Sequence, residues 1–209
     1  MADLSSYIEP KSILCFGDSL TYGYNSRTKS RYPTNKRWTG ILQEKLGSGY
    51  KIIEDGLNGR TTIFDDPYLP DRNGSKCLPM ILESNLPIDT VVIMLGTNDQ
   101  SLYFKNTTEN FFGMSTLIGI IRKSGISNII LMSPPKINKV SEYHMKMKFG
   151  EDLPNLNEQY KQLSLFFKLT FIDLSALIVL DYENYDGIHL SERDNEIVAD
   201  AVYEKLIIV

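Results

Sequence analysis

Short apolar runs alternate along this chain with segments of helical periodicity, and this alternation limits the possible folds more than any other feature. The runs are short and mainly apolar, without strict alternation of polar residues, which is typical of strands that are buried on both faces of a parallel sheet. They occupy residues 12–16, 51–53, 90–95, 128–132 and 171–174. We therefore predict a parallel sheet of roughly five strands.

Apolar side chains recur at spacings of three and four in the segments between these runs, as on the buried face of an amphipathic helix. The periodic segments are residues 38–46, 111–121, 156–167 and 197–206. Ser191 and Asp194 have the spacing of a cap at the start of the last helix. Alternation of strands and helices predicts right-handed βαβ units, and hence a doubly wound α/β sheet.

The size and charge of the chain exclude several other classes of protein. It has 209 residues, which predicts a single domain over residues 1–209. A hydrophobic fraction of 42% is enough for a real core and argues against a disordered chain. With 22 Lys and Arg against 26 Asp and Glu, the formal net charge is −4. A mildly acidic chain lacks the basic patch of a nucleic-acid groove, so we expect no nucleic-acid partner.

Cysteine and histidine are scarce. The chain has only Cys15 and Cys77, and only His144 and His189. These counts argue against a disulfide scaffold and against a Cys- or His-rich metal site, so we expect no metal and no cofactor. The first ten residues lack the basic start and apolar core of a signal peptide, and no run approaches the length of a membrane span. We therefore expect a cytoplasmic protein without membrane insertion.

In a doubly wound sheet, ligands bind where the strands end at their carboxyl edge. Ser19 follows the first predicted strand, in Gly-Asp-Ser-Leu. A serine hydroxyl needs an adjacent base to become a nucleophile. Asp186 and His189 are three residues apart, so that the carboxylate can hold one ring nitrogen while the other faces the serine. Each motif also has a structural interpretation, since Ser19 suits a helix N-cap and the Asp-x-x-His segment suits a capped loop. His144 is the rival base, but it lies in a charged segment that we interpret as a solvated loop.

Two further strand ends carry candidate hydrogen-bond donors. Asn98 follows the most apolar strand, and its amide is able to donate to a developing oxyanion. Gly59 follows the second strand and offers its backbone N–H to the same anion. The structural alternatives are an Asx-turn at Asn98 and a turn glycine at Gly59. All the candidate residues nevertheless fall on one edge of the predicted sheet.

The sequence resembles the SGNH hydrolases, also called the GDSL esterase/lipase family, over nearly its whole length. Four blocks carry the resemblance, in the chain order that the family shows: residues 16–21 (FGDSLT), the segment around Gly59, residues 96–99 (GTND) and Asp186-x-x-His189. The runs RWTG (37–40), RTT (60–62) and DDP (65–67) are closest to the bacterial arylesterase/acyltransferase branch. Some arylesterase relatives have alanine where Gly59 stands, a choice that leaves a backbone donor in place.

The resemblance implies a three-layer α/β/α, flavodoxin-like fold. It also implies Ser19 as nucleophile, His189 as base and Asp186 as its partner, with an oxyanion hole formed by the N–H groups of Ser19 and Gly59 and the amide of Asn98. Members of the arylesterase branch act on short acyl esters, some transfer the acyl group, and many form homo-oligomers. We therefore expect a serine esterase for small ester substrates, without a cofactor, that forms a homo-oligomer.

Three features of the sequence allow more than one interpretation. Trp38 has the spacing of a helix core face, although in the arylesterase branch it would line the acyl pocket. Asp18 is expected to organise the turn before Ser19 and to lie beside the bound substrate. Residues 137–152 are polar and lysine-rich and are interpreted as a surface loop or lid. The alternatives to an aryl esterase are a carbohydrate acetyl esterase, which shares the same machinery, and a non-catalytic α/β binding module.

Overall fold

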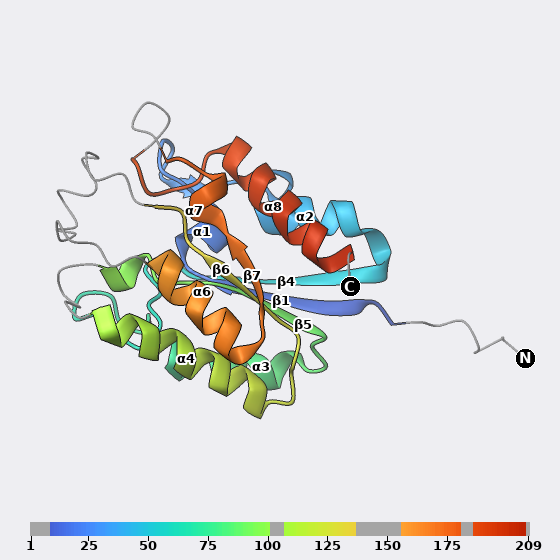
Figure 1. Cartoon of the computed structure of the whole chain (residues 1–209). Helices are drawn as coiled ribbons and strands as arrows, with labels where there is room; N and C mark the ends of the chain where they lie inside the picture. Colours follow the sequence, from blue (N-terminus) through green and yellow to red (C-terminus); the bar gives the residue numbers. More distant parts are fainter. Residues whose placement is uncertain (1–8, 101–106, 137–155, 181–185, 208–209) are drawn as a thin grey trace, which may run out of the picture.

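A five-stranded parallel sheet forms the centre of the molecule, with strand order β4-β1-β5-β6-β7. The computed structural model describes residues 9–100, 107–136, 156–180 and 186–207 (Figure 1). The strands are β1 (Lys11–Gly17), β4 (Tyr50–Gly56), β5 (Thr90–Met94), β6 (Ile129–Ser133) and β7 (Thr170–Asp173). The expectation of a doubly wound α/β sheet with five parallel strands is therefore confirmed.

Helices cover both faces of this sheet and give three layers (Figure 1). Side chains at alternate strand positions point to opposite faces, so β1 sends Leu14 and Phe16 to one core and Ile13 and Cys15 to the other. The first core is closed by α3 (Gly74–Asn85), α4 (Thr107–Lys123) and α6 (Leu156–Phe167), and the second by α2 (Trp38–Leu46) and α8 (Glu192–Ile207). The remaining short elements are α1 (Ser19–Tyr22), α7 (Leu174–Leu177), η2 (Thr34–Lys36), η3 (Gly47–Gly49), η4 (Asn98–Gln100), and the hairpin of β2 (Tyr24–Asn25) and β3 (Ser30–Arg31).

The sequence periodicity located α2, α4, α6 and α8 but omitted α3. This helix contains Pro79, a residue that usually interrupts a helix. Its start is stabilised by Asn73, whose side chain accepts a hydrogen bond from the backbone N–H of Ser75. The predicted cap of α8 is present as a reciprocal pair, since the Asp194 N–H donates to the Ser191 hydroxyl and the Ser191 N–H donates to the Asp194 carboxylate.

The order in which the chain adds strands to the sheet reverses at β1, and the candidate residues lie beside this reversal. After β1 the chain moves to β4 on one side, and it then returns to β5, β6 and β7 on the other side. The carboxyl end of the strands beside such a switch point is the usual ligand site of this architecture. Ser19 follows β1 directly, and Asn98 lies four residues beyond the end of β5.

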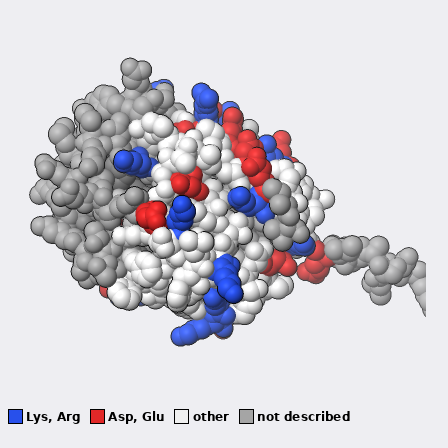
Figure 2. Space-filling view, in the orientation of Figure 1, with Lys and Arg blue, Asp and Glu red and all other residues white. Residues whose placement is uncertain are grey.

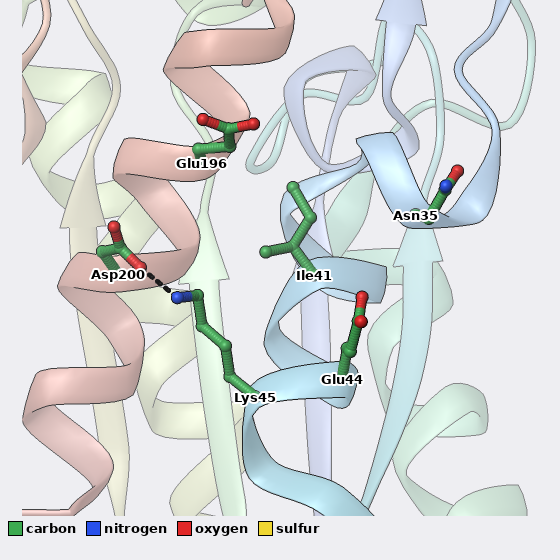
Figure 3. A pocket seen from close by; sticks show the side chains of 6 residues that line it. All are labelled: Asn35, Ile41, Glu44, Lys45, Glu196 and Asp200. Carbon is green, nitrogen blue, oxygen red and sulfur yellow. Dashed lines mark ion pairs between the residues drawn. The ribbon is translucent and has the colours of Figure 1, made fainter.

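The helices α2 and α8 form one flank of the molecule. A hollow of about 410 Å³ runs between the two helices, and Figure 3 shows that charged side chains dominate its lining. Lys45 of α2 forms an ion pair with Asp200 of α8 across it, with a nitrogen–oxygen distance of 2.8 Å. None of the candidate site residues lines this hollow. On the face seen in Figure 2, basic and acidic side chains are interspersed rather than gathered by sign.

Two further sequence expectations concern residues 137–152 and insertion into a membrane. Residues 137–152, interpreted above as a loop or lid, and His144 within them lie outside the described residues. Of the helices that the structure does describe, none has both the length and the apolar character that a bilayer span requires.

Candidate active site

Ser19 stands at the sharp turn between β1 and α1. The turn needs glycine at position 17, because a Cβ atom there would lie 2.7 Å from the backbone oxygen of Met94 on the neighbouring strand. Asp18 caps α1, and its Oδ1 accepts the Leu20 N–H at 2.9 Å. Ser19 is thereby fixed at the carboxyl edge of the sheet with 7% of its surface exposed.

The imidazole of His189 lies between Ser19 and Asp186. Its Nε2 is 2.9 Å from the Ser19 Oγ, and its Nδ1 is 2.7 Å from the Asp186 Oδ2. A carboxylate at Nδ1 favours the tautomer with the proton on Nδ1, and this tautomer turns the Nε2 lone pair toward the serine hydroxyl. The three side chains therefore have the spacing that a nucleophile, a general base and an orienting carboxylate require.

Hydrogen bonds within residues 186–189 hold this segment in its conformation. The second carboxylate oxygen of Asp186, Oδ1, accepts the backbone N–H groups of Ile188 at 3.1 Å and of His189 at 3.0 Å. Burial opposes ionisation of Asp186, but the hydrogen bond from His189, its charge and the two backbone donors outweigh burial and lower the pKa of the carboxyl. Asp186 is consequently an anion that holds the ring of His189 in place.

Gly59 lies in a tight turn beside the end of β1. The Arg60 N–H donates to the Leu57 carbonyl at 3.0 Å and closes the turn, and the Leu57 N–H donates to the Gly17 carbonyl at 3.1 Å. Gly59 has a φ of +78°, a backbone conformation that residues with a Cβ adopt only with strain. An alanine at this position would keep the backbone donor, but in this chain it would strain the turn.

The Asn98 amide reaches the same turn from the end of β5. Its Nδ2 donates to the Arg60 carbonyl at 3.0 Å and lies 3.5 Å from the Asp18 Oδ2. Asn98 thus joins the turn of Gly59 to the residue that precedes Ser19. The three candidate oxyanion donors, contributed by Ser19, Gly59 and Asn98, therefore lie on neighbouring segments of one sheet edge.

Two carboxyl groups beneath this edge are fully buried. Burial raises the pKa of Asp18 to about 7, against the opposing effect of the Leu20 N–H and of His189. Burial likewise raises the pKa of Asp99 to about 6, although the Thr62 hydroxyl and N–H both donate to it. Asp18 has no exposed surface, and its Oδ1 caps α1. We therefore assign it to the turn before Ser19 and leave it out of the substrate contacts proposed below.

Trp38 is placed in the core. It has no exposed surface and packs within the cluster between the sheet and helices α2 and α8, while its backbone N–H donates to the Asn195 side chain at 3.0 Å. This agrees with its helical spacing. A fully covered side chain offers no surface to a substrate, so we leave Trp38 out of the site proposed below.

Sequence reasoning gave no role to three residues that contact the site. The Tyr24 ring lies against the His189 ring, with centroids 4.7 Å apart. Asp99 binds Thr62, next to the glycine turn, and Arg60 is buried beneath that turn. Arg60 and Asp99 directly adjoin Gly59 and Asn98 and stand in the RTT and GTND runs that carry the resemblance, which are the signals that the sequence offers for them. Within the described part of the chain, no group of three or more His, Cys, Asp or Glu side chains is arranged to hold a metal.

Comparison with known proteins bears directly on this geometry. The model of the GDSL-like lipase/acylhydrolase family matches residues 15–196. Among solved structures, the inhibitor-bound aryl esterase of M. smegmatis is 34% identical, with a TM-score of 0.87 over 94% of this chain and 98% of that one. Est24, a carbohydrate acetylesterase from Sinorhizobium meliloti, is 38% identical, with a TM-score of 0.85 and the same coverage. Comparison with curated protein sequences gives no match.

Proposed function

Because the chain belongs to the GDSL-like lipase/acylhydrolase family, whose members are also called SGNH hydrolases, and is a carboxylic ester hydrolase, we propose that it cleaves short-chain esters through an acyl-enzyme on Ser19. The observation that carries this proposal is the continuous hydrogen-bonded series from Ser19 through His189 to Asp186. Such a series supplies the base that a serine hydroxyl lacks by itself.

In the proposed reaction His189 removes the proton from Ser19 as its Oγ attacks the ester carbonyl. The negative charge that develops on the carbonyl oxygen is held by the N–H groups of Ser19 and Gly59 and by the Asn98 amide. Collapse of the tetrahedral intermediate breaks the ester bond, and the imidazolium of His189 donates its proton to the leaving alcohol. Asp186 stabilises that imidazolium without becoming protonated itself. Water, activated by the same imidazole, then releases the acid and restores Ser19.

The direct test is hydrolysis of p-nitrophenyl acetate by Ser19→Ala. We expect kcat to fall by at least about 10³-fold while the thermal unfolding midpoint changes little, because only the nucleophilic oxygen is removed. Ser133→Ala is the matched control, since Ser133 is also a buried serine at the carboxyl end of a strand. Its Oγ has no hydrogen-bond partner among the described residues. Wild-type turnover by Ser19→Ala would overturn the proposal.

The comparisons also favour a second candidate substrate. The relatives include both an aryl esterase and a carbohydrate acetylesterase at similar identity. Both chemistries use one set of catalytic groups and differ in the alcohol that leaves. Parallel assays with an aryl acetate and a peracetylated sugar separate them, and addition of a primary alcohol to the aryl acetate assay measures acyl transfer against hydrolysis. We favour the aryl or small alkyl ester because of the sequence runs shared with the arylesterase branch.

We also propose that the protein is a homo-oligomer. Large apolar side chains are exposed on the outer helices, with Met80 of α3 68% exposed and Phe166 of α6 78% exposed. The proposal rests on the resemblance to the arylesterase branch, many of whose members form homo-oligomers, and these side chains are apolar surface that a second chain would cover. Light scattering coupled to gel filtration measures the mass directly, and a mass of one chain would contradict this part of the proposal.

A further inference from the structure

Arg60 is a buried charge at the site that the proposed reaction does not use. Only 4% of its surface is exposed, and its guanidinium stacks on the Phe16 ring with the central carbon 4.2 Å from the ring centroid. Its Nη2 forms an ion pair with the Asp55 carboxylate at 2.7 Å. Burying a guanidinium carries a large desolvation penalty unless most of its donors find partners, so its position calls for a physical reason.

The side chain of Arg60 joins the ends of two strands. One nitrogen, Nη1, donates to the Gly17 carbonyl at the end of β1 at 2.9 Å and to the Asp55 carbonyl near the end of β4 at 2.6 Å. Gly17 lies two residues before Ser19. The guanidinium therefore fastens the strand that carries the nucleophile to the strand that leads into the glycine turn.

The backbone of the same residue directly follows Gly59 and contacts Asn98. The Arg60 N–H closes the turn that contains Gly59, and the Arg60 carbonyl accepts the Asn98 Nδ2 at 3.0 Å. Movement of Arg60 would displace the Gly59 N–H and the Asn98 amide together. A hydrogen-bond donor stabilises an oxyanion only at the correct distance and direction, so such a displacement would weaken stabilisation of the transition state.

We propose that Arg60 is the positioning residue of the oxyanion hole, holding the turn of Gly59 and the amide of Asn98 at fixed distances from Ser19. The inference rests on the proposed function, because it presumes that these groups bind an oxyanion. Lysine cannot replace arginine in this role, since the planar fork of the guanidinium bonds two carbonyls and a carboxylate at once, whereas an ammonium is a single point of charge.

Arg37 provides a matched control within the same chain. It is 7% exposed and forms an ion pair with Glu54, the residue next to Asp55 on β4, also at 2.7 Å. It donates to the Tyr32 carbonyl at 2.9 Å, and among the described residues its other side-chain hydrogen bonds go to Thr34 and Glu54, not to the glycine turn or Asn98. Loss of Arg37 therefore has the structural consequences of losing a buried arginine without the contacts to the candidate donors.

The test compares p-nitrophenyl acetate hydrolysis by Arg60→Lys and by Arg37→Lys. It also includes the variant Asn98→Ala and the double variant that carries Arg60→Lys and Asn98→Ala. We expect Arg60→Lys to lower kcat about tenfold or more with KM within about twofold, because the lost interaction is made in the transition state. Arg37→Lys is expected to keep kcat within about twofold of the wild type. In the Asn98→Ala background the loss caused by Arg60→Lys should become at least about threefold smaller, since both changes damage one group of donors.

Two outcomes would overturn the inference. One is an unchanged kcat in Arg60→Lys, and the other is an equal fold-loss of kcat on Arg60→Lys substitution in the wild-type and Asn98→Ala backgrounds. If Arg60→Lys does not fold, Asp55→Asn takes its place, because it removes the charged partner while the Arg60 side chain and both carbonyls remain. Its kcat is then measured with and without the Asn98→Ala substitution. Ser19→Ala, assayed first, separates the two proposals. Full activity of Ser19→Ala would overturn the proposed function, whereas its inactivity combined with additive effects of Arg60 and Asn98 would overturn only the role of Arg60.

Discussion

The two sides of the candidate site are held in place in different ways. On the base side, Asp186 and His189 belong to one tetrapeptide, and the Asp186 carboxylate binds the backbone and the ring of its own neighbour. On the oxyanion side, Gly59 and Asn98 come from two loops that follow different strands. The backbone carbonyl of the buried Arg60 joins the Gly59 turn to Asn98, and its guanidinium pairs with Asp55. The base side is thus a local structure that meets Ser19 through one contact, whereas the oxyanion side is a network through the interior.

This difference has consequences for substitution. A change at Asp186 on the base side should remove chemistry and leave the fold almost intact, because the hydrogen bonds of its carboxylate stay within residues 186–189. A change on the oxyanion side should reduce activity by smaller steps and lower stability at the same time, since buried polar groups lose their partners.

On the base side, Asp186→Asn should lower kcat by about 10³–10⁴-fold. The amide keeps the shape of the carboxylate but loses the charge that stabilises the imidazolium, and it favours the wrong tautomer of His189. The measurement is kcat for p-nitrophenyl acetate together with the thermal unfolding midpoint. A variant that retained more than about a tenth of the wild-type kcat would contradict the role given to Asp186.

On the oxyanion side, Asn98→Ala should lower kcat by about 10²–10³-fold with little change in KM, because one of three donors to the transition state is lost. Steady-state kinetics on the same ester separate the two parameters. If KM rose while kcat stayed constant, Asn98 would bind the ground state and would not belong to an oxyanion hole.

Deeper on the oxyanion side, Asp99→Ala should lower the free energy of unfolding by about 1–3 kcal/mol, because it leaves the buried Thr62 N–H and hydroxyl without an acceptor. We expect kcat to fall on the order of tenfold as the neighbouring turn shifts. Asp99→Asn keeps an oxygen acceptor and should recover most of both losses. Urea denaturation and kinetics on the two variants provide the check, and equal losses in both would show that shape and hydrogen bonding are not what Asp99 supplies.

The smallest effect is the response of stability to pH, which has opposite signs for Asp18 and Asp186. The folded pKa of Asp18 is about 7 against an ordinary 3.8, so between these values the folded state binds a proton that the unfolded state has released. This contribution makes the free energy of unfolding fall as pH rises from about 4 to 7. Asp186 has a lowered pKa, so its contribution is present above pH 4 and is lost as pH falls through the folded pKa.

Asp18→Asn should therefore flatten the decline in stability between pH 4.5 and 7, while Asp186→Asn should destabilise the protein more at pH 7 than at pH 3. Urea titrations of the wild type and both variants at these pH values measure the slopes. A wild-type slope in Asp18→Asn would mean that Asp18 ionises in its ordinary range in the folded protein.

The same contrast explains which parts of the fold and of the candidate site can be predicted from the sequence. Asp186 and His189 could be predicted because their chemistry requires these residue types at a short spacing, and Ser19 because it directly follows the first strand. The strands β1, β5 and β6 could be predicted because they are mainly apolar on both faces. Arg60 and Asp99 were not assigned, since their partners Gly17, Asp55 and Thr62 become neighbours only when the sheet forms. Helix α3 was missed because Pro79 outweighs its short apolar stripe when the pattern is considered alone.

The central claim is that His189 activates Ser19 as a nucleophile. The most direct measurement is mass spectrometry after treatment with a fluorophosphonate, in which the serine oxygen displaces fluoride from phosphorus. We predict one phosphonyl group per chain, located on the peptide that contains Ser19, with complete loss of esterase activity and no labelling in Ser19→Ala or after denaturation. Label on another residue, or an unlabelled enzyme that remains active, would contradict the account.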